Sequence, residues 1–318
     1  MDPRGQKTGH PGWEDYLAGL VEEHGSLAAL AERLATLRGH SEDVASIERA
    51  LRRLRGRGTQ SGGKWGARLL RAYGLPPDVD ARLRFMGSYH SRFVDLPVPL
   101  CLDLVQLWDR PPTSEGRLGR MWLALARVVI AFRQQDHATA AAQLDLARRS
   151  EPDENGRIEI ALGQALLASR EARGVVPAVL DPVEGWLAEL SGPEADCLRA
   201  RWAGQVAFAL HRAGDHAAAE ARMLALPDAD DTPPFARARR ANGLAYSRHR
   251  LGDPAAALAY ARASARHAGD AGHVRLRAMA LLMIARVASG TPEGADARAR
   301  ARGIAEALED PTLLLRAG

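Results

Sequence analysis

The sequence predicts an all-α fold, a solenoid of helical hairpins preceded by a small helical domain, and two observations predict it. First, Ala and Leu are abundant in a chain of 318 residues that is 46% hydrophobic, whereas Val, Ile, Thr and aromatic residues are sparse. This composition favours helices over strands. Second, one turn with the same small neighbours recurs about every 39 residues. Hairpins that repeat at such a period bury their apolar faces by stacking on their neighbours.

The clearest copy of the hairpin is expected as one helix over residues 235–251 and a second over 254–267. Between them, Gly252 supplies the left-handed backbone conformation that ends a helix. A proline follows at the first position of the second helix, where no hydrogen bond is lost. The small side chains of Ala245 and Ala257 face each other across the turn and let the two helices approach closely.

The turn residue marks five such units along the chain. The markers are 39, 40, 38 and 38 residues apart: Gln135, Gly174, Gly214, Gly252 and Gly290. Five positions after them come Ala140, Val179, Ala219, Ala257 and Ala295. Eleven positions before them come Ala124, Gly163, Ala203, Ala241 and Met279. A period and a small-residue register that agree over five units rarely arise by chance.

This pattern resembles a tetratricopeptide-repeat (TPR) array over roughly residues 117–310. The residues that carry the resemblance are Ala245, Gly252-Asp253 and Ala257, with further copies at Ala207, Gly214-Asp215 and Ala219 and at Asp136, Ala140 and Pro152. The resemblance implies a right-handed α-solenoid in which the first helix of each hairpin lines a concave groove. The period is longer than the usual one of about 34 residues, and Ala, Leu or Val replaces most of the bulky aromatic residues.

Breaks in the pattern divide the chain into four expected parts. They are a disordered tail at 1–12, a helical domain at 13–75, a degenerate linking repeat at 79–112, and the TPR-like array with a C-terminal cap at 117–318. The tail is polar and contains Gly and Pro, and Pro76-Pro77 marks the end of the first domain. A cap is expected because the ends of a solenoid need atypical units.

Residues 13–56 resemble a helix-turn-helix DNA-binding domain. Three helices are expected: one over 13–24, a second that begins after the N-cap Ser26, and a third that begins after the N-cap Ser41. The resemblance is carried by GSLAALAERL and VASIERALRRLR, and it implies binding to duplex DNA. The interval between the second and third helices is longer than the tight turn of that motif.

Basic residues concentrate after the start of the third helix. Residues 1–75 hold 12 Lys/Arg against 9 Asp/Glu, and no acidic residue lies between Arg49 and Arg71. Phosphate contact needs a basic helix face backed by an apolar one. The candidate nucleic-acid-binding residues are Arg49, Arg52, Arg53, Arg55, Arg57, Lys64 and Arg68. The alternative is a solvated helix face followed by an ordinary loop.

No catalytic constellation, metal site or cofactor motif is expected. Residues 58–64 match the spacing of a P-loop, but no strand precedes them and Trp65 stands where Ser or Thr would hold magnesium. The histidines form no H-E-x-x-H, and Cys101 and Cys197 form no C-x-x-C. An enzyme is therefore the least favoured class. Two cysteines, a polar start and no long apolar run fit a cytoplasmic protein without a signal peptide or membrane span.

Arginine, histidine and aromatic residues recur in register on the first helices of the last three units. The TPR resemblance makes them candidates for a partner-binding groove: Arg201, Phe208, His211, Arg239, Asn242, Tyr246, His249 and Arg277. A second arginine set lies two positions earlier, at Arg199, Arg237 and Arg275. Positions two apart point in different directions on a helix, so one set is expected to face the groove. The alternative is that these charges are simply solvated.

The function expected from these features is a cytoplasmic transcription regulator or sensor. The first domain would bind duplex DNA, and the groove would bind a peptide or protein, for which Arg and His favour an acidic partner or another anion. A second copy of the chain is a further candidate partner. The alternative is an adaptor or scaffold for protein–protein interaction with no nucleic-acid role.

Overall fold

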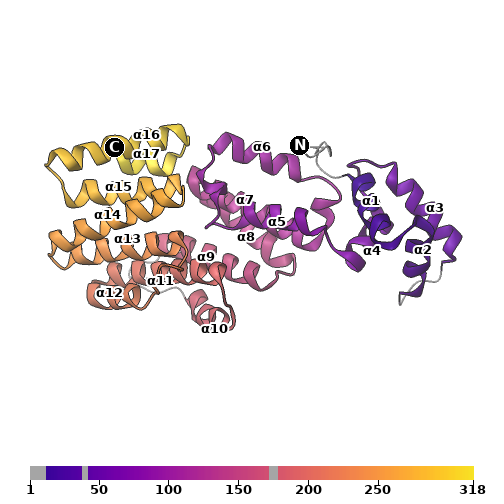
Figure 1. The fold of residues 1–318 in the computed structure, drawn as a ribbon, viewed down its shortest axis with the longest axis horizontal. Coiled ribbons are helices and arrows are strands. Elements are labelled where there is room, and N and C mark those ends of the chain that lie inside the picture. Colours follow the sequence, from indigo (N-terminus) through magenta and orange to yellow (C-terminus); the bar gives the residue numbers. More distant parts are fainter. Residues whose placement is uncertain (1–11, 38–41, 172–177) are drawn as a thin grey trace.

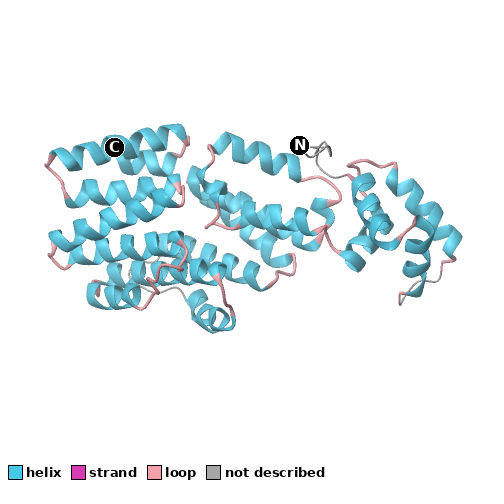
Figure 2. Cartoon of the chain, viewed as in Figure 1, coloured by secondary structure: helices cyan, strands magenta, loops and turns pink. Residues whose placement is uncertain are grey.

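The computed structural model describes residues 12–37, 42–171 and 178–318, and within these ranges every regular element is a helix (Figures 1 and 2). The all-α fold class expected from the sequence is therefore confirmed. The expected tail, apart from Gly12, and the turn marker Gly174 lie outside the described residues.

The first four helices share a hydrophobic core of their own at one end of the molecule (Figure 1). They are α1 (Trp13–His24), α2 (Leu27–Thr36), α3 (Val44–Arg55) and α4 (Gly63–Tyr73). Helices α1, α2 and α3 contact one another, and α4 packs on α3. Trp13 is fully buried, and its indole N–H donates to the Gln60 carbonyl at 2.9 Å. The Tyr16 hydroxyl donates to the Gly74 carbonyl at 2.8 Å, which ties α1 to the end of α4.

The larger part of the chain is a stack of hairpins. Its helices are α7 (Arg117–Gln134), α8 (His137–Arg149), α9 (Glu154–Glu171), α10 (Asp181–Glu189), α11 (Pro193–Ala213), α12 (His216–Leu224), α13 (Pro234–Arg250), α14 (Pro254–Asp270), α15 (Val274–Val287) and α16 (Pro292–Ala307), with a 3-10 turn η3 at Ala178–Leu180. Each helix packs on its neighbour in the chain, and α7, α9, α11, α13 and α15 also contact one another in turn. These five form what we call the first-helix row. The turn between α13 and α14 falls where the sequence places it.

The turn markers share one local structure. Gln135, Gly214 and Gly252 have φ angles of 62°, 89° and 83°, in the left-handed region that ends a helix. The aspartate that follows each marker caps the next helix. Its carboxylate accepts the backbone N–H three residues on, at 2.9, 2.9 and 3.0 Å for Asp136, Asp215 and Asp253. Each aspartate satisfies a donor that the helix itself leaves free, so the repeated Asp is an N-cap.

The small-residue register holds in three hairpins and shifts in the last. Ala140, Ala219 and Ala257 are fully buried, whereas Ala295 is exposed. Helix α11 ends directly before Gly214, but two residues separate the end of α15 from Gly290. Because the linker to the glycine differs in length, a position counted from the turn no longer corresponds to the same position on the helix.

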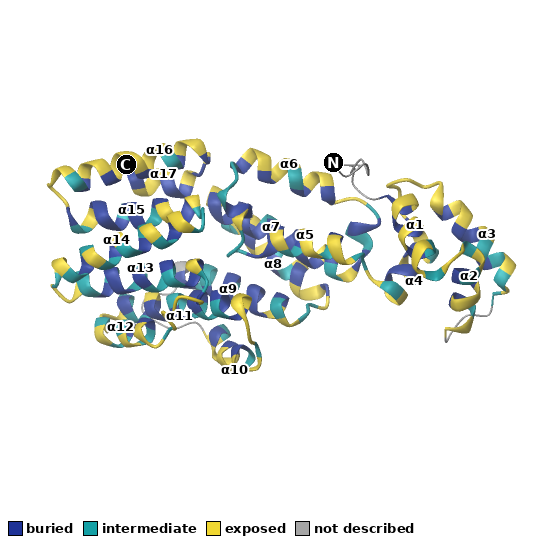
Figure 3. Cartoon of the chain, in the orientation of Figure 1, coloured by how far each residue is buried: buried dark blue, intermediate teal, exposed yellow. Residues whose placement is uncertain are grey.

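The linking segment differs from the expected degenerate hairpin. It contains α5 (Pro77–Gly87), the 3-10 turn η1 (Arg92–Asp95), α6 (Val98–Trp108) and the 3-10 turn η2 (Thr113–Glu115). Helix α5 begins at the second proline of the expected break. Helices α5 and α6 each pack on α7 instead of pairing with one another. Helix α7 is apolar on nearly every side, and these helices cover it, so that it is almost entirely buried (Figure 3).

The array closes on its own beginning. The last helix, α17 (Pro311–Ala317), packs on α16 and α15 and also on α7. The backbone N–H of Val98 donates to the Leu308 carbonyl at 3.0 Å. The Thr312 hydroxyl lies 3.0 Å from the carbonyl oxygens of Phe132 and Arg133 at the end of α7. The C-terminal segment therefore covers an internal helix as well as ending the stack. None of the described helices is both long and apolar enough to cross a membrane.

Candidate functional site: a buried arginine cluster and an exposed basic helix

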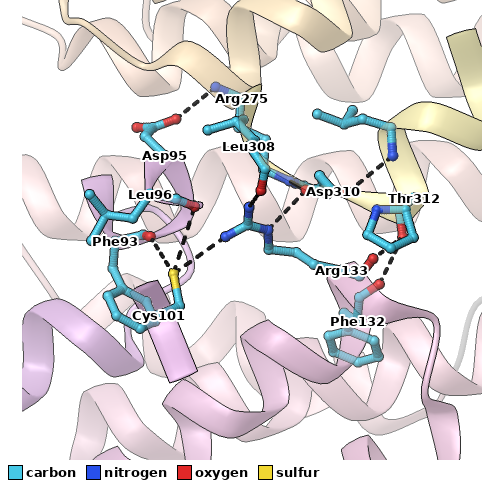
Figure 4. Close-up of polar contacts among 12 residues, drawn as sticks. Phe93, Asp95, Leu96, Cys101, Phe132, Arg133, Arg275, Leu308, Asp310 and Thr312 are labelled. Atoms are coloured by element: carbon cyan, nitrogen blue, oxygen red, sulfur yellow. Dashed lines mark hydrogen bonds and ion pairs between the residues drawn. The ribbon is translucent and has the colours of Figure 1, made fainter. Parts of the chain in front are cut away.

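One carboxylate joins the start and the end of the array (Figure 4). Arg133 at the end of α7 and Asp310 before α17 are both completely buried, and Arg133 Nε donates to Asp310 Oδ2 at 2.9 Å. Arg275 on α15 donates to the same oxygen at 2.8 Å. Asp310 also caps α17 through the Leu313 N–H at 3.1 Å. The remaining donors of Arg133 are directed at the Leu308 carbonyl and the Cys101 sulfur.

A second carboxylate holds η1 against α15. Asp95 accepts the backbone N–H of Arg275 at 2.7 Å through Oδ1, and its Oδ2 lies 3.3 Å from His273 Nδ1. The Asp95 side chain is almost completely buried. Two carboxylates thus fix the position of Arg275, Asp95 from the linking segment and Asp310 from the C-terminal segment.

Tyr89, in the segment between α5 and η1, lies among three arginines of the first-helix row. Its hydroxyl accepts Arg275 Nη1 at 2.8 Å, and the Arg201 guanidinium lies 5.0 Å from the centre of its ring. The next residue, His90, is 3.5 Å from a carboxylate oxygen of buried Glu159. Glu159 also pairs with Arg201. The segment at 89–90 therefore packs against α9, α11 and α15 together.

The charges in this cluster act on one another. Burial alone would raise the pKa of Tyr89, but Arg275, Arg239 and Arg201 outweigh it and the pKa is lowered. Burial would also raise the pKa of Glu159, but the Arg201 charge and the nearby His90 lower that pKa to about 2. Glu159 is consequently ionised, and its charge balances that of Arg201.

Arg239 on α13 is the unbalanced member of the cluster. Its Nε is buried, and no hydrogen bond or ion pair to it occurs among the described residues. Burial, together with the charges of Arg201 and Arg275, lowers the pKa of Arg239, although Tyr89 opposes this. The side chain lies beside Gly204 of α11, where a β-carbon would come within 3.0 Å of Arg239 Nη2. Glycine at that position gives the guanidinium its room.

The predicted groove arginines divide between two places. Arg201 and Arg239 lie beside Tyr89 in the cluster, and the third arginine there is Arg275, not Arg277. Arg277 lines a shallow surface depression with Arg262 and Arg266 between α14 and α16. The cluster around Tyr89 therefore takes Arg201 and Arg239 from one predicted register and Arg275 from the other. Counted from the end of their helices, Arg201, Arg239 and Arg275 stand 12, 11 and 12 residues back, whereas counting from the turn glycine introduces the two-residue shift of the last hairpin.

The other predicted groove residues gather on the C-terminal half of α11 and α13. His211 is buried, 3.1 Å from Ser247 Oγ and 3.1 Å from His216, with its ring edge-on to Tyr246. Burial and then the neighbouring His216 and Arg250 lower its pKa to about 4. These contacts give His211 a packing role between hairpins. The remaining members are exposed or partly exposed: Phe208, Asn242 and His249.

The basic candidates of the first domain are mostly exposed. Ile47, Leu51 and Leu54 of α3 are buried, and Arg49, Arg52 and Arg53 lie on the opposite, solvated side, as the sequence predicts. Arg52 pairs with Glu48 on the same helix at 2.5 Å. Arg55 lies 3.5 Å from Glu14 of α1, and Arg57 donates to the Ser61 carbonyl.

Lys64 and Arg68 are held by an acid from outside the basic stretch. Both pair with Glu42, at 2.6 and 3.0 Å. The hydrogen bond from Lys64 outweighs desolvation and, with Arg68, lowers the pKa of Glu42 to about 2. No acidic residue lies between Arg49 and Arg71 in the sequence, but in the folded chain Glu42 partly neutralises the positive charge of this stretch.

Sequence reasoning missed Tyr89, Glu159, Arg133 and Asp310. The available signal was Arg133 itself, a charge directly after the longest apolar run of the chain, where it requires a buried partner. Nothing in the spacing connects it to an aspartate 177 residues away. Among the described side chains, His, Cys, Asp and Glu do not gather in any group of three that could hold a metal ion.

No protein-family model, curated protein or solved structure matches this chain. The candidate site is consequently defined by its geometry and charge.

Proposed function

We propose that the protein is a transcription regulator in which the first domain, of helix-turn-helix type, binds duplex DNA. One observation carries the proposal. The exposed face of α3 presents Arg49, Arg52 and Arg53, while its opposite face is packed into a separate small core. A rigid helix with a basic outer side is what contact with the DNA backbone requires. The domain lies at one end of the molecule, which leaves that side free of the array (Figure 1).

We further propose that the hairpin stack is a TPR-like, right-handed array that serves as the sensor. Support comes from the Asp-capped turns at Asp136, Asp215 and Asp253 and from the arginine cluster on its first-helix row. A peptide or protein partner would act on this row. Because the segment at Tyr89 joins the array to α5 and hence to the first domain, a partner there has a route to the DNA-binding helix.

Binding to duplex DNA tests the regulator proposal. The full chain is expected to bind with a steep dependence on salt, because counterions leave the DNA when arginines contact phosphates. The double substitution Arg52→Glu plus Arg53→Glu is expected to abolish the binding, measured by fluorescence anisotropy at about 50 and 200 mM salt.

The matched control is Arg298→Glu plus Arg302→Glu on α16, at the other end of the molecule. Both arginines are exposed, and Arg302 pairs with Glu306 four residues on, as Arg52 pairs with Glu48. This control changes the net charge equally and is expected to leave DNA binding nearly intact. Equal losses in both double variants, or no binding by the wild type at low salt, would contradict the proposal.

The pairing of Lys64, Arg68 and Arg52 with glutamates favours a second candidate, an adaptor without a nucleic-acid role. Such pairs reduce the positive potential of the basic stretch. In that case the partners captured from lysate by the full chain are expected to be proteins and to persist after nuclease treatment.

A further inference from the structure

We infer that the arginine cluster around Tyr89 binds one compact oxyanion of single charge, a carboxylate or a phosphodiester, on Arg239. This inference deepens the sensor half of the proposed function, since it names the chemistry that the array recognises. The binding surface is made by α11, α13 and α15 together with the segment that carries Tyr89.

The unpaired guanidinium is the first argument. A buried charge is costly unless it is paired and hydrogen-bonded. Arg133, Arg201 and Arg275 all meet this condition through Asp310 or Glu159. Arg239 does not: its side chain is partly exposed, but its buried Nε has no acceptor among the described residues, and its charge acts on Tyr89 and both neighbouring arginines. An oxyanion supplies the missing acceptor.

The charge count is the second argument. Four arginines and three carboxylates form the inner part of the cluster: Arg133, Arg201, Arg239, Arg275, Asp95, Glu159 and Asp310. Among these seven side chains, one positive charge remains. A singly charged anion neutralises it, whereas a doubly charged one leaves a net negative charge in a partly buried place.

Shape and access are the third argument. A guanidinium presents its donors in a planar fork that matches two oxygens of one anion. Arg239 and Tyr89 are both partly exposed, so the cluster is open to solvent on that side. Gly204 lets the guanidinium lie against α11, because a β-carbon there would come within 3.0 Å of Arg239 Nη2. An anion held here would contact the segment that carries Tyr89 as well as α13. It would thereby strengthen the closure of the array.

Thermal unfolding of the full chain tests the inference. Sodium acetate represents the carboxylate and sodium dimethyl phosphate the phosphodiester; sodium sulfate tests the preference for single charge, and sodium chloride at equal ionic strength is the reference. At least one of the first two is expected to raise the Tm saturably, by roughly 2–4 °C at about ten times its Kd, and sulfate is expected to raise it less.

Arg239→Met is expected to abolish this rise while its own Tm stays at or above that of the wild type, because an unbalanced charge has been removed. The control Arg277→Met removes an arginine from the outer depression and should respond to the anions as the wild type does. Should Arg239→Met be too unstable to measure, Arg239→Lys replaces it. That variant keeps the charge but loses the fork, and it should show a reduced rise.

The outcomes separate the inference from the function on which it rests. No anion effect beyond chloride, an equal effect in Arg239→Met, or a larger effect of sulfate overturns the inference. None of these outcomes bears on DNA binding, which is measured separately. Loss of DNA binding with an intact, Arg239-dependent anion effect overturns the regulator proposal instead.

Discussion

The chain uses arginine in two opposite ways. On α3 and α4 the guanidinium groups are exposed or partly exposed, and their partners are Glu48 one turn away and Glu42 in the segment before α3. In the array, Arg133 and Arg275 are buried and share one carboxylate that comes from the end of the chain. The exposed groups remain free to exchange partners, whereas the buried ones have a single arrangement.

The difference follows from solvation. An exposed ion pair is worth about 0–1 kcal/mol, because water and salt screen it. Removing one partner of a buried pair leaves a charge that water cannot reach, and costs about 3–5 kcal/mol. Stability in this molecule therefore depends on the arginines of the array, and surface electrostatics depends on those of the first domain. The following predictions test that division, from the largest expected effect to the smallest.

Asp310→Asn should be the most damaging single change. It preserves the size of the side chain and the oxygen that caps α17, but it leaves Arg133 and Arg275 without a counter-charge. The expected loss of unfolding free energy is about 3–5 kcal/mol, measured by urea denaturation. Asp296→Asn, which breaks the exposed pair with Arg300, should cost no more than about 0.5 kcal/mol. Similar losses in both variants would remove the distinction between buried and exposed pairs.

Glu159→Gln should have the next largest effect, about 2–4 kcal/mol, since the amide keeps one acceptor for Arg201 but no charge. The folded-state pKa of Glu159 is lowered to about 2, so the unfolded chain takes up the proton first as the pH falls. Wild-type stability is therefore lost between the ordinary pKa of about 4.5 and about pH 2. Glu159→Gln should flatten that loss, and Glu184→Gln, at an exposed pair with Arg222, should not.

His211 should make stability depend on pH at milder acidity. Its folded-state pKa is about 4, below the ordinary value of about 6.5, so protonation favours the unfolded chain. Stability from this group is complete above about pH 6.5 and is lost towards pH 4, by about 1–2 kcal/mol after allowance for partial solvent access. Urea midpoints from pH 8 to pH 4 should show the slope, and His211→Asn should reduce it. An unchanged slope would contradict the assignment.

Glu42→Gln should have the smallest effect on folding. Its carboxylate is partly exposed and pairs with Lys64 and Arg68. Thermal unfolding should be unchanged, while DNA affinity at low salt should rise a few-fold because two basic side chains are released and one negative charge is lost. A fall in Tm with no gain in affinity would show that this pair supports the fold and not the surface potential.

Local features of the fold were predictable from the sequence. The turn at Gly252, the helices on either side of it, and the apolar face of α3 all follow from residue identity and spacing within one hairpin. These features depend on backbone conformation and on contacts between residues a few turns apart, which a pattern records directly.

The closure and the cluster were not predictable in this way. Asp310 meets Arg133 because the stack bends until α17 reaches α7, and that path is the sum of small rotations at every hairpin. Arg275 and not Arg277 joins the cluster, because two additional residues separate the end of α15 from its turn glycine. A repeat period averages over such insertions, so it finds the hairpins but not which side chains meet between them.

The seating of α17 on α7 also bears on how this protein can evolve. An open stack gains or loses a hairpin by duplication or deletion at little cost, because each unit contacts only its neighbours. Here an additional hairpin would separate Val98 from Leu308 and Arg133 from Asp310. The number of units is thus set by the geometry of a ring, and length variation among relatives that share this closure should be confined to loops such as residues 225–233.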